Sequence, residues 1–501
     1  MLKFVPVFTS YSTMGGIAIY VRKRKYKRFD YYERELPDAY YIRYDDRELF
    51  ITKPGCRDYE YQTFLKDYDY AINLDMFGAF YDTEEIMVTF VKKAFSIKER
   101  LYDKHSGAIT IYGDSGGYQL ITGTLNFVDP VDVAIYYNRC VNLGMPLDIP
   151  PIFEVDNSTL ERSAKIQKLN TIKMLQVLDE DVKLYNIIHG FNRIQREIYF
   201  DVVKDVLPND MIAIGGLYKG TPFDCVLNIF NTIEITKSKK FHIFGMSGAY
   251  LIPMFALIGM NYDLTTDSSE HIQYGIRMGF LTFYKGRMTS FGVGNAYTGK
   301  SSEDSTIHSN SSFQSLSCSC DICNAIGTNK IYYRSKFSTI SHAIISFHNL
   351  FLLKKYVEVW NDIVNSESIP YIFKMLEKTY PRKIKDTYLK CARFILDTFD
   401  SSLSKTYKKY RSFFSDFAIK GFRPNPMLFS RGDSEEEKNI AFYNTILERY
   451  EKYHEGLNIK QICLNEKGTK SFKPSQLNKK SYKSDLFSVK NRKSRKRKRK
   501  E

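Results

Sequence analysis

Short apolar runs alternate with longer amphipathic segments through the middle of this chain, from about residue 68 onward. Each run has the composition of a buried strand, and each following segment has the spacing of a helix. Repeated β-then-α units with short connections imply parallel strands, and about eight such units close into a barrel. The runs are YAINL (70–74), AITIYG (108–113), MPLDI (145–149), YNIIHG (185–190), MIAIGGL (211–217), FHIFGM (241–246) and YDLTTD (262–267).

These runs predict a (β/α)₈ TIM barrel of the α/β class. YAINL is expected to precede a helical stretch from Asp82, and a further helix is expected to open at Asp129-Pro130. The segment 158–178 reads as another helix of the barrel. The eighth strand is expected near FLTFY (280–284).

The remaining segments define the domain organisation. Residues 1–65 contain β-type runs and are expected to form a β-rich N-terminal extension. The barrel domain is expected at 66–355, with an inserted zinc-binding subdomain at 300–355. Residues 356–464 have helical spacing, and 465–501 are polar and Lys-rich, which favours a disordered basic tail.

The charge balance favours an anionic partner. The chain of 501 residues has a formal net charge of +16, and nucleic acid is the first candidate partner for such an excess. Residues 490–501 contain nine Lys or Arg residues and one Glu, so they contribute +8. This tail can act as an electrostatic arm on phosphates, or as a localisation or solubility segment.

The sequence predicts an intracellular protein in a reducing, cytoplasmic environment. Eight cysteines form no regular disulfide pattern, and the first residues have no long apolar core of a signal peptide. The uncharged stretch Ile243–Met260 contains three glycines and a proline. A strand, a turn and a buried helix explain it better than a membrane span, so no membrane association is expected.

A metal motif is the most specific local signal. Cys318, Cys320 and Cys323 place three thiols on one tight turn, and Zn²⁺ favours four S or N ligands in a tetrahedron. His348 is the expected fourth ligand, and His342 is its rival. Because these ligands would fill the coordination shell, the predicted zinc is structural.

A second motif, DSGGYQ, follows the predicted strand at 108–113. Asp114 stands at the strand end, where barrel active sites lie, and Ser115 follows it. Gly116 and Gly117 allow the backbone to approach a flat ligand, and Tyr118 could stack on a ring. Other polar or small residues follow later strands in the same way, although a single Asp there can simply cap a helix. They are Asp148, His189, Gly215, Gly216 and Asp267.

Taken together, these motifs resemble the tRNA-guanine transglycosylase superfamily. DSGGYQ, LDIPP, IIHG, IGGL, the Asp267-Ser268 turn and CxCxxC followed by HNL occur here in the family's order, over about residues 70–355. The resemblance implies a (β/α)₈ barrel with a zinc subdomain. It also implies cleavage of the N-glycosidic bond to guanine and attachment of a 7-deazaguanine, of the preQ0 kind, to the same sugar.

The resemblance also implies roles for individual residues. Asp114 matches the general acid/base, and Asp267 matches the carboxylate that attacks the sugar. Asp148 matches an acid that binds the polar edge of the base. The backbone of Gly215 and Gly216 lines the base pocket, to which Ser115 and Tyr118 also belong.

Two positions depart from the family's pattern. His189 stands where many members have Gln, so its hydrogen bonds to the base are an open question. Asp267 is followed by Ser268, where common bacterial members have Cys. Asp263, four residues earlier, is therefore kept as a weaker alternative for the nucleophile.

The expected partners are a nucleic acid and a free 7-deazaguanine base. The YQLITG context, the long N-terminal extension and the lack of an obvious C-terminal RNA-binding barrel resemble the branch that modifies DNA, with tRNA as the alternative. An inactive nucleic-acid-binding partner and a base-excising hydrolase are the rival functions, because fold does not fix function. The sequence leaves open whether the enzyme acts as a homodimer.

Overall fold

A computed structural model describes most of the chain. It divides into two units, Met1–Glu451 and Lys452–Glu501. The described residues are 1–8, 17–23, 32–36, 39–44, 47–52, 68–74, 85–90, 110–151, 154–217, 221–245, 248–268, 279–284, 287–292, 318–326, 338–418 and 433–455. The basic tail expected at 465–501 lies outside them.

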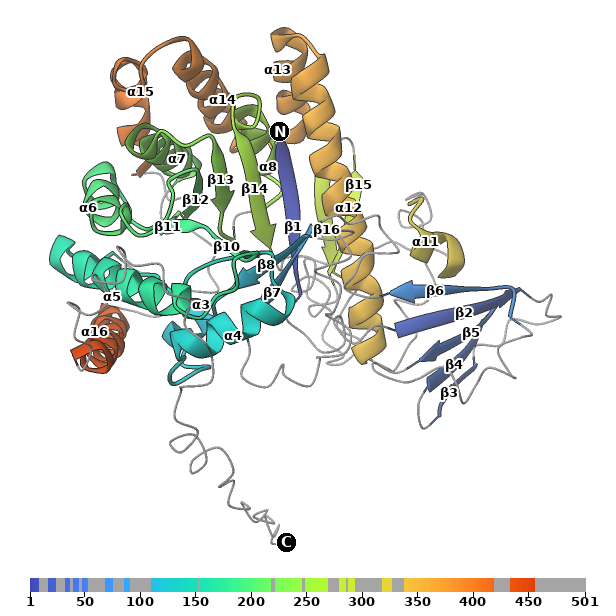
Figure 1. Cartoon of the computed structure of the whole chain (residues 1–501). Helices are drawn as coiled ribbons and strands as arrows, with labels where there is room; N and C mark the ends of the chain where they lie inside the picture. The colour runs from blue at the N-terminus through green and yellow to red at the C-terminus, as the bar shows by residue number, and fades with distance from the viewer. Residues whose placement is uncertain are drawn as a thin grey trace, which may run out of the picture. The chain divides into compact units, whose positions relative to one another are not determined.

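A nine-stranded parallel sheet organises the larger unit, which has a mixed α/β fold (Figure 1). Its strand order is β10-β9-β8-β7-β1-β14-β13-β12-β11, and every neighbouring pair is parallel. The strands are β1 (Leu2–Phe8), β7 (Glu85–Thr89), β8 (Thr110–Asp114), β9 (Leu143–Gly144), β10 (Lys183–Leu184), β11 (Asn186–Ile188), β12 (Met211–Ile214), β13 (Lys240–Ile243) and β14 (Asp263–Ser268).

The sheet is barrel-like and nearly closed. Its two outermost strands, β10 and β11, are separated along the chain by Tyr185 alone, so both edges of the sheet come from one run of residues. Alternate side chains of the strands meet inside, because successive residues of a strand face opposite sides. This buried cluster consists of Val5, Val7, Met87, Tyr112, Met145, Tyr185, Ile187 and Ala213.

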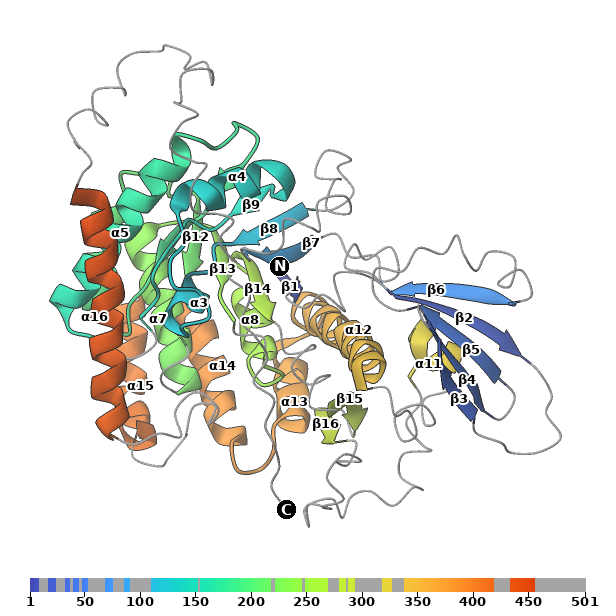
Figure 2. The same cartoon turned by 90° about the horizontal axis from the view of Figure 1, so that it is seen from below.

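Helices follow most of these strands and pack around them (Figure 2). Asp129 caps α4 by accepting a hydrogen bond from the backbone of Val131, with Pro130 in the first turn, as the sequence predicts. Asp156 and Asn192 cap α5 and α6 in the same manner. The helices are α3 (Gly117–Ile121), α4 (Pro130–Cys140), α5 (Asn157–Leu175), α6 (Arg193–Val203), α7 (Pro222–Thr236) and α8 (Ile252–Ile258).

Helices from the C-terminal third complete this outer layer. α4, α5, α6 and α7 pack in succession, α14 packs against both α7 and α8, and α12 packs against α8 and β1. The boundary expected at residues 355/356 therefore falls inside α12, and the helical region is not separate from the barrel-like sheet. The helices of the C-terminal third are α11 (Asp321–Ile326), α12 (Ser338–Ser366), α13 (Ile369–Thr379), α14 (Lys385–Asp400), α15 (Leu403–Ala418) and α16 (Asp433–Glu455).

The first strand corrects the expected N-terminal extension. β1 lies between β7 and β14 in the parallel sheet instead of in a separate 1–65 domain. Its start is fixed by Asn361 of α12, whose side chain bonds both the N–H and the C=O of Leu2 at 3.2 and 2.8 Å. The N-terminal amine also donates to the Gly259 carbonyl at 2.7 Å.

The rest of the N-terminal region is β-rich, as expected. It forms an antiparallel sheet of order β3-β4-β5-β2-β6. Its strands are β2 (Ile17–Lys23), β3 (Tyr32–Glu35), β4 (Ala39–Tyr44), β5 (Arg47–Thr52) and β6 (Tyr70–Leu74).

Three expected elements of the barrel are therefore wrong. YAINL is β6 and pairs antiparallel with β2, and a strand, β7, occupies part of the stretch expected to be helical from Asp82. FLTFY lies in β15 (Gly279–Tyr284), which pairs with β16 (Arg287–Gly292) as a hairpin instead of closing the barrel. Apolar alternation marks a strand but does not identify its partner, which explains the errors at YAINL and FLTFY. At β7 the type of element was wrong, because a short apolar run can belong to a helix or to a strand.

None of the described helices combines the length and the apolar composition that a membrane span requires. The uncharged stretch Ile243–Met260 contains the end of β13 and the seven-residue helix α8, whose residues are all buried.

Candidate functional site

Asp148 is the centre of a polar cluster at the carboxyl edge of the parallel sheet. It follows β9, and its Oδ1 accepts a hydrogen bond from Ser115 Oγ at 3.2 Å. Its Oδ2 lies 2.8 Å from Nε2 of His189, the residue that follows β11. A carboxylate requires a donor, so Nε2 carries the proton and Nδ1 is left as an acceptor in the neutral ring. Nδ1 has no hydrogen-bond partner among the described residues.

All four predicted glycines are required by close approach or backbone conformation. A Cβ on Gly117 would lie 2.4 Å from the Asp148 carbonyl oxygen, and one on Gly215 would lie 2.1 Å from His189 Nδ1. Gly116 and Gly216 have φ of 82° and 72°, which is the left-handed region that favours glycine. These two turns therefore bring backbone close to the cluster around Asp148.

A buried arginine supports the Gly215-Gly216 turn. Arg196 of α6 donates to the Gly215 carbonyl and to Thr232 Oγ1, both at 3.0 Å. Burial lowers the pKa of Arg196 to about 9. Because the guanidinium is enclosed, the bond to Thr232 holds it in place, and the bond to the Gly215 carbonyl orients the turn.

Asp267 lies at the end of β14 and is oriented by two donors. Its Oδ1 accepts from the backbone N–H of Gly245 at 2.8 Å and from Nε2 of His242 at 3.2 Å. Within the described part of the chain, both hydrogen bonds to this carboxylate go to Oδ1. The carboxylate plane is thereby fixed and Oδ2 is left for another partner.

Asp114 has a different electrostatic environment. Burial, followed by the negative charge of Asp148, raises its pKa to about 7, and the charge of Asp267 adds to this. Hydrogen bonds from the backbone of Gly116 and the side chain of Thr89 oppose the shift. The structure therefore brings Asp148 and Asp267 close enough for their charges to act on Asp114.

Two other residues of the sequence analysis differ from this group in exposure. Tyr118 is on α3 and is 42% exposed, so its ring is open to solvent or to a ligand. Asp263 is exposed at the first residue of β14, at the opposite end of that strand from Asp267.

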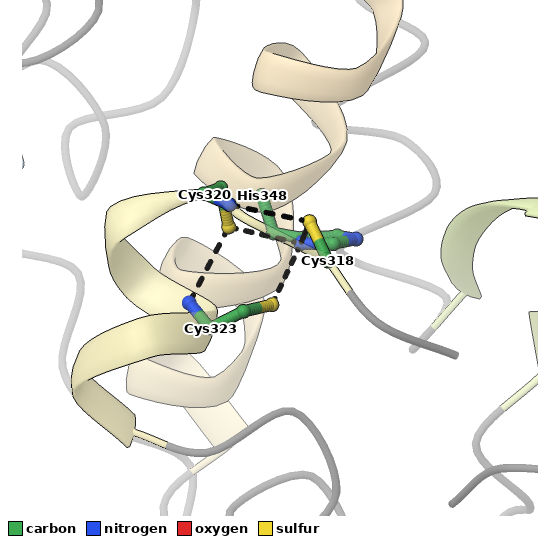
Figure 3. A group of neighbouring side chains, drawn as sticks. All are labelled: Cys318, Cys320, Cys323 and His348. Atoms are coloured by element: carbon green, nitrogen blue, oxygen red, sulfur yellow. Dashed lines mark hydrogen bonds between the residues drawn. The ribbon is translucent and has the colours of Figure 1, made fainter. Parts of the chain in front are cut away.

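The predicted metal ligands form a second cluster, shown in Figure 3. The ligand atoms of Cys318, Cys320, Cys323 and His348 all lie within 4.8 Å of one another. Nδ1 of His348 is 3.7, 3.4 and 3.2 Å from the three sulfur atoms in that order. Hydrogen bonds from Cys320 and then Cys323 hold the pKa of Cys318 well below its usual value. This Cys₃His group could hold a metal ion and is consistent with zinc.

His348 and Asn349 connect this cluster to the β15–β16 hairpin. Nε2 of His348 donates to the Leu281 carbonyl at 2.9 Å, and the Leu281 N–H donates to Asn349 Oδ1 at 2.8 Å. With its proton on Nε2, His348 presents the lone pair of Nδ1 to the thiols. Metal-binding histidines commonly make such a hydrogen bond with the ring nitrogen that does not bind the metal. The side chain of His342 lies outside the described part of the chain.

A cavity of about 310 Å³ lies away from both clusters. It is near the beginning of β13 and β14, and Lys237, Lys239, Tyr262 and Ser402 are among its lining residues. None of the predicted site residues lines it, and two helices, α7 and α14, end beside it. The geometry gives it no connection to the carboxylates.

Sequence reasoning missed the residues that support the site. His242 and Thr265 are buried on the neighbouring strands β13 and β14 and bond to each other. Arg196 is on the buried side of α6. Thr89 is the last residue of β7, a strand that the sequence analysis did not predict. The charged or imidazole side chains inside otherwise apolar runs were the available signal, since such residues are buried only with partners.

Fold and site together define a class of protein. It is a mixed α/β protein with a nearly closed parallel sheet, a carboxylate cluster at the carboxyl edge and a separate Cys₃His group. No protein-family model matches the chain, and no curated protein is significantly similar to it in sequence.

Proposed function

We propose that this chain is a base-exchange transglycosylase of the tRNA-guanine transglycosylase type, which replaces guanine in DNA with a 7-deazaguanine. The carboxylate group at the carboxyl edge of the sheet carries the proposal. Asp114 and Asp267 have different surroundings there, and such pairs are typical of sites that need one acid and one nucleophile. Active sites of parallel barrels also lie at this edge.

In the first step, Oδ2 of Asp267 attacks C1′ of the sugar. The bond between C1′ and N9 of guanine breaks, and its electron pair remains on the base. A proton from Asp114 neutralises the developing negative charge, which would otherwise make guanine a poor leaving group. The product is an ester between Asp267 and the sugar, with guanine free in the pocket.

In the second step, N9 of the 7-deazaguanine attacks the same C1′. The ester bond breaks, its electron pair returns to Asp267, and Asp114 takes up the proton from the incoming base. Bonds and protons balance over the two steps, since one N-glycosidic bond is exchanged for another.

The base pocket that we propose lies between the two glycine turns. Asp148 would accept from the N–H groups on the base's polar edge, although Ser115 and His189 already bind its two oxygens. The backbone of Gly215 approaches His189 closely, and Ser115 and His189 bond different oxygens of Asp148. Tyr118, with its exposed ring, is the proposed stacking residue.

For the Cys₃His group we propose a resident structural Zn²⁺ held by Cys318, Cys320, Cys323 and His348. The donor set suits zinc, and the proton on Nε2 leaves Nδ1 free to coordinate. No step of the exchange uses this site. Its role would be to hold α11, α12 and the β15–β16 hairpin together.

Radiolabelled guanine tests the function directly. Purified full-length protein is incubated with labelled guanine and either duplex DNA or unmodified tRNA, with the Asp267→Asn variant as the matched control. We expect label in DNA, none in tRNA, and none with the variant. Mass spectrometry of nucleosides from DNA and tRNA of expressing cells then identifies the inserted base.

Each rival function has its own outcome in this assay. Label in tRNA alone would show that tRNA, and not DNA, is the substrate. Release of guanine without incorporation, leaving abasic sites, would indicate the hydrolase. Binding of nucleic acid without release or incorporation would indicate an inactive partner.

A further inference from the structure

A hydrogen-bonded chain runs through the interior of the sheet to Asp267. Nδ1 of His242 lies 2.8 Å from Thr265 Oγ1, and Nε2 of the same ring lies 3.2 Å from Asp267 Oδ1. Thr265 Oγ1 is also 3.3 Å from the Phe241 carbonyl oxygen. His242 is fully buried, so both ring nitrogens depend on these protein partners.

The partners determine which nitrogen carries the proton. A carboxylate oxygen can only accept, so Nε2–H must donate to Asp267. Thr265 then donates its single hydroxyl proton to Nδ1, the shorter of its two contacts. A protonated imidazole would also fit, because the hydroxyl can turn and donate to the Phe241 carbonyl instead. In both states the bond from Nε2–H to Asp267 is kept.

We propose that His242 is a positioning residue for the nucleophile Asp267, an inference that rests on the proposed function. With Gly245, it fixes Oδ1 through two donors, so that Oδ2 is held toward the sugar. The carboxylate does not have to find this orientation during the reaction, and preorganised groups of this kind lower the barrier. Thr265 completes the arrangement by fixing the tautomer of His242.

The neutral ring is the competent state. Attack on the sugar uses up the negative charge of Asp267, so a cationic imidazole would stabilise the carboxylate more than the ester and would slow the step. The groups facing His242 are Asp267 and Thr265 from β14, Phe244 from its own segment, Tyr112 from β8 and Tyr185. Burial raises the pKa of both tyrosines well above the usual value, so they remain neutral.

Substitutions at position 242 separate positioning from packing. His242→Gln keeps a side-chain N–H that can reach Asp267, whereas His242→Phe keeps a buried ring without a donor. Tyr112→Phe is the matched control, since it keeps a neighbouring buried ring and removes neither hydrogen bond of His242. The full-length protein is used in single-turnover adduct formation, nucleic-acid binding and thermal unfolding.

We expect His242→Phe to slow adduct formation roughly ten- to hundredfold, the range for losing one hydrogen bond to a charged group. Nucleic-acid affinity should stay unchanged, and His242→Gln should restore most of the rate. Tyr112→Phe should form the adduct at nearly the wild-type rate.

Nitrogen NMR of histidine-labelled protein gives a readout independent of activity. The signals of His242 should report a neutral ring with the proton on Nε2, and Asp267→Ala should shift them. Adduct formation by His242→Phe at the wild-type rate, or a proton on Nδ1 in the neutral ring, would overturn this inference alone. Absence of any adduct from wild-type protein with DNA and tRNA would instead overturn the proposed function and this inference with it.

Discussion

Two aspartates on β14 stand in very different positions, although only three residues separate them. Asp263 is exposed at the start of the strand, whereas Asp267 is buried at its end and accepts two hydrogen bonds. Four residues of a strand span about 13 Å, so one nucleotide cannot reach both carboxylates in the same way. This separation makes the choice of nucleophile testable.

Asp267→Asn is expected to abolish the covalent adduct while the protein still folds and binds nucleic acid. Asn is a poor nucleophile but preserves the shape of the side chain and its contact with Gly245. Asp263→Asn is the matched control and should form the adduct normally. The measurement is adduct trapping on a denaturing gel with nucleic acid and a guanine analogue. An adduct lost only in Asp263→Asn would assign the nucleophile to the other end of the strand.

The raised pKa of Asp114 predicts the pH dependence of the first step. A carboxyl with a pKa of about 7 is protonated below that pH and loses its proton as the pH rises through it. Since guanine departs with a proton from Asp114, single-turnover rates should fall above about pH 7. Asp114→Asn should lose at least roughly 100-fold in rate, as is typical of general acid–base groups, and should lack this limb.

Stability measurements check the same shift without activity. Because the folded-state pKa lies above the usual value, the native protein binds more protons than the unfolded chain between about pH 4 and 7. The free energy of unfolding contributed by Asp114 therefore decreases as the pH rises through this window. Denaturant unfolding should show this decrease in wild type relative to Asp114→Asn. Parallel curves for the two proteins would argue against a raised pKa.

At the scale of elements, the Cys₃His cluster connects parts that are far apart in the chain. α11 supplies one ligand and the residues just before it supply two, α12 supplies His348, and the same histidine holds Leu281 of β15. A helix, a long helix and a hairpin therefore meet at one small site. Structural zinc in small modules contributes on the order of 10 kcal/mol to folding. Loss of a bound zinc should therefore destabilise α11, α12 and the β15–β16 hairpin.

One equivalent of zinc is expected in the purified protein by elemental analysis. Cys320→Ser should lose it, whereas Cys391→Ser, at a buried cysteine of α14, should keep it. Chelation should speed amide hydrogen exchange at 279–292 and 318–326 and leave α5 unchanged. If the His348→Ala variant retains zinc and the His342→Ala variant loses it, the fourth ligand is misassigned. Wild-type protein that contains no zinc would show that the Cys₃His group is not a zinc site.

For the whole molecule, the net charge is concentrated at one end of the sequence. Residues 490–501 contribute +8 of the net +16. Attraction to phosphates releases counterions, so binding weakens as salt rises. The tail should therefore affect how strongly nucleic acid is captured and leave the chemistry at the carboxylates unaffected.

Deletion of 488–501 is expected to weaken nucleic-acid binding and to flatten its salt dependence. Each phosphate contact that is lost should reduce the slope of log affinity against log salt by about 0.9. The rate of adduct formation at saturating nucleic acid should stay nearly constant. Binding titrations over a range of salt concentrations measure this, with a tail in which the basic residues are replaced by serine as the control for length. An unchanged slope would assign the tail to another role.

The sequence by itself determined the features that depend on neighbours along the chain. The spacing of Cys318, Cys320 and Cys323 fits them to one turn, and the structure brings them to His348 as predicted. Asp114 and Asp267 were found because polar residues after apolar runs mark strand ends, and the strands that they end are β8 and β14. Capping by Asp129 was equally local.

Only the tertiary structure decided the pairings between distant segments. β1 joins β7 and β14 although the sequence favoured a separate extension, and YAINL pairs with β2. The hydrogen bonds of His242 with Asp267 and of His348 with Leu281 could not be predicted either, because they too join residues that are distant in the sequence. The period of two in a strand specifies which side chains face inward, but a strand's neighbour is selected by the summed burial and hydrogen bonding of the closed sheet.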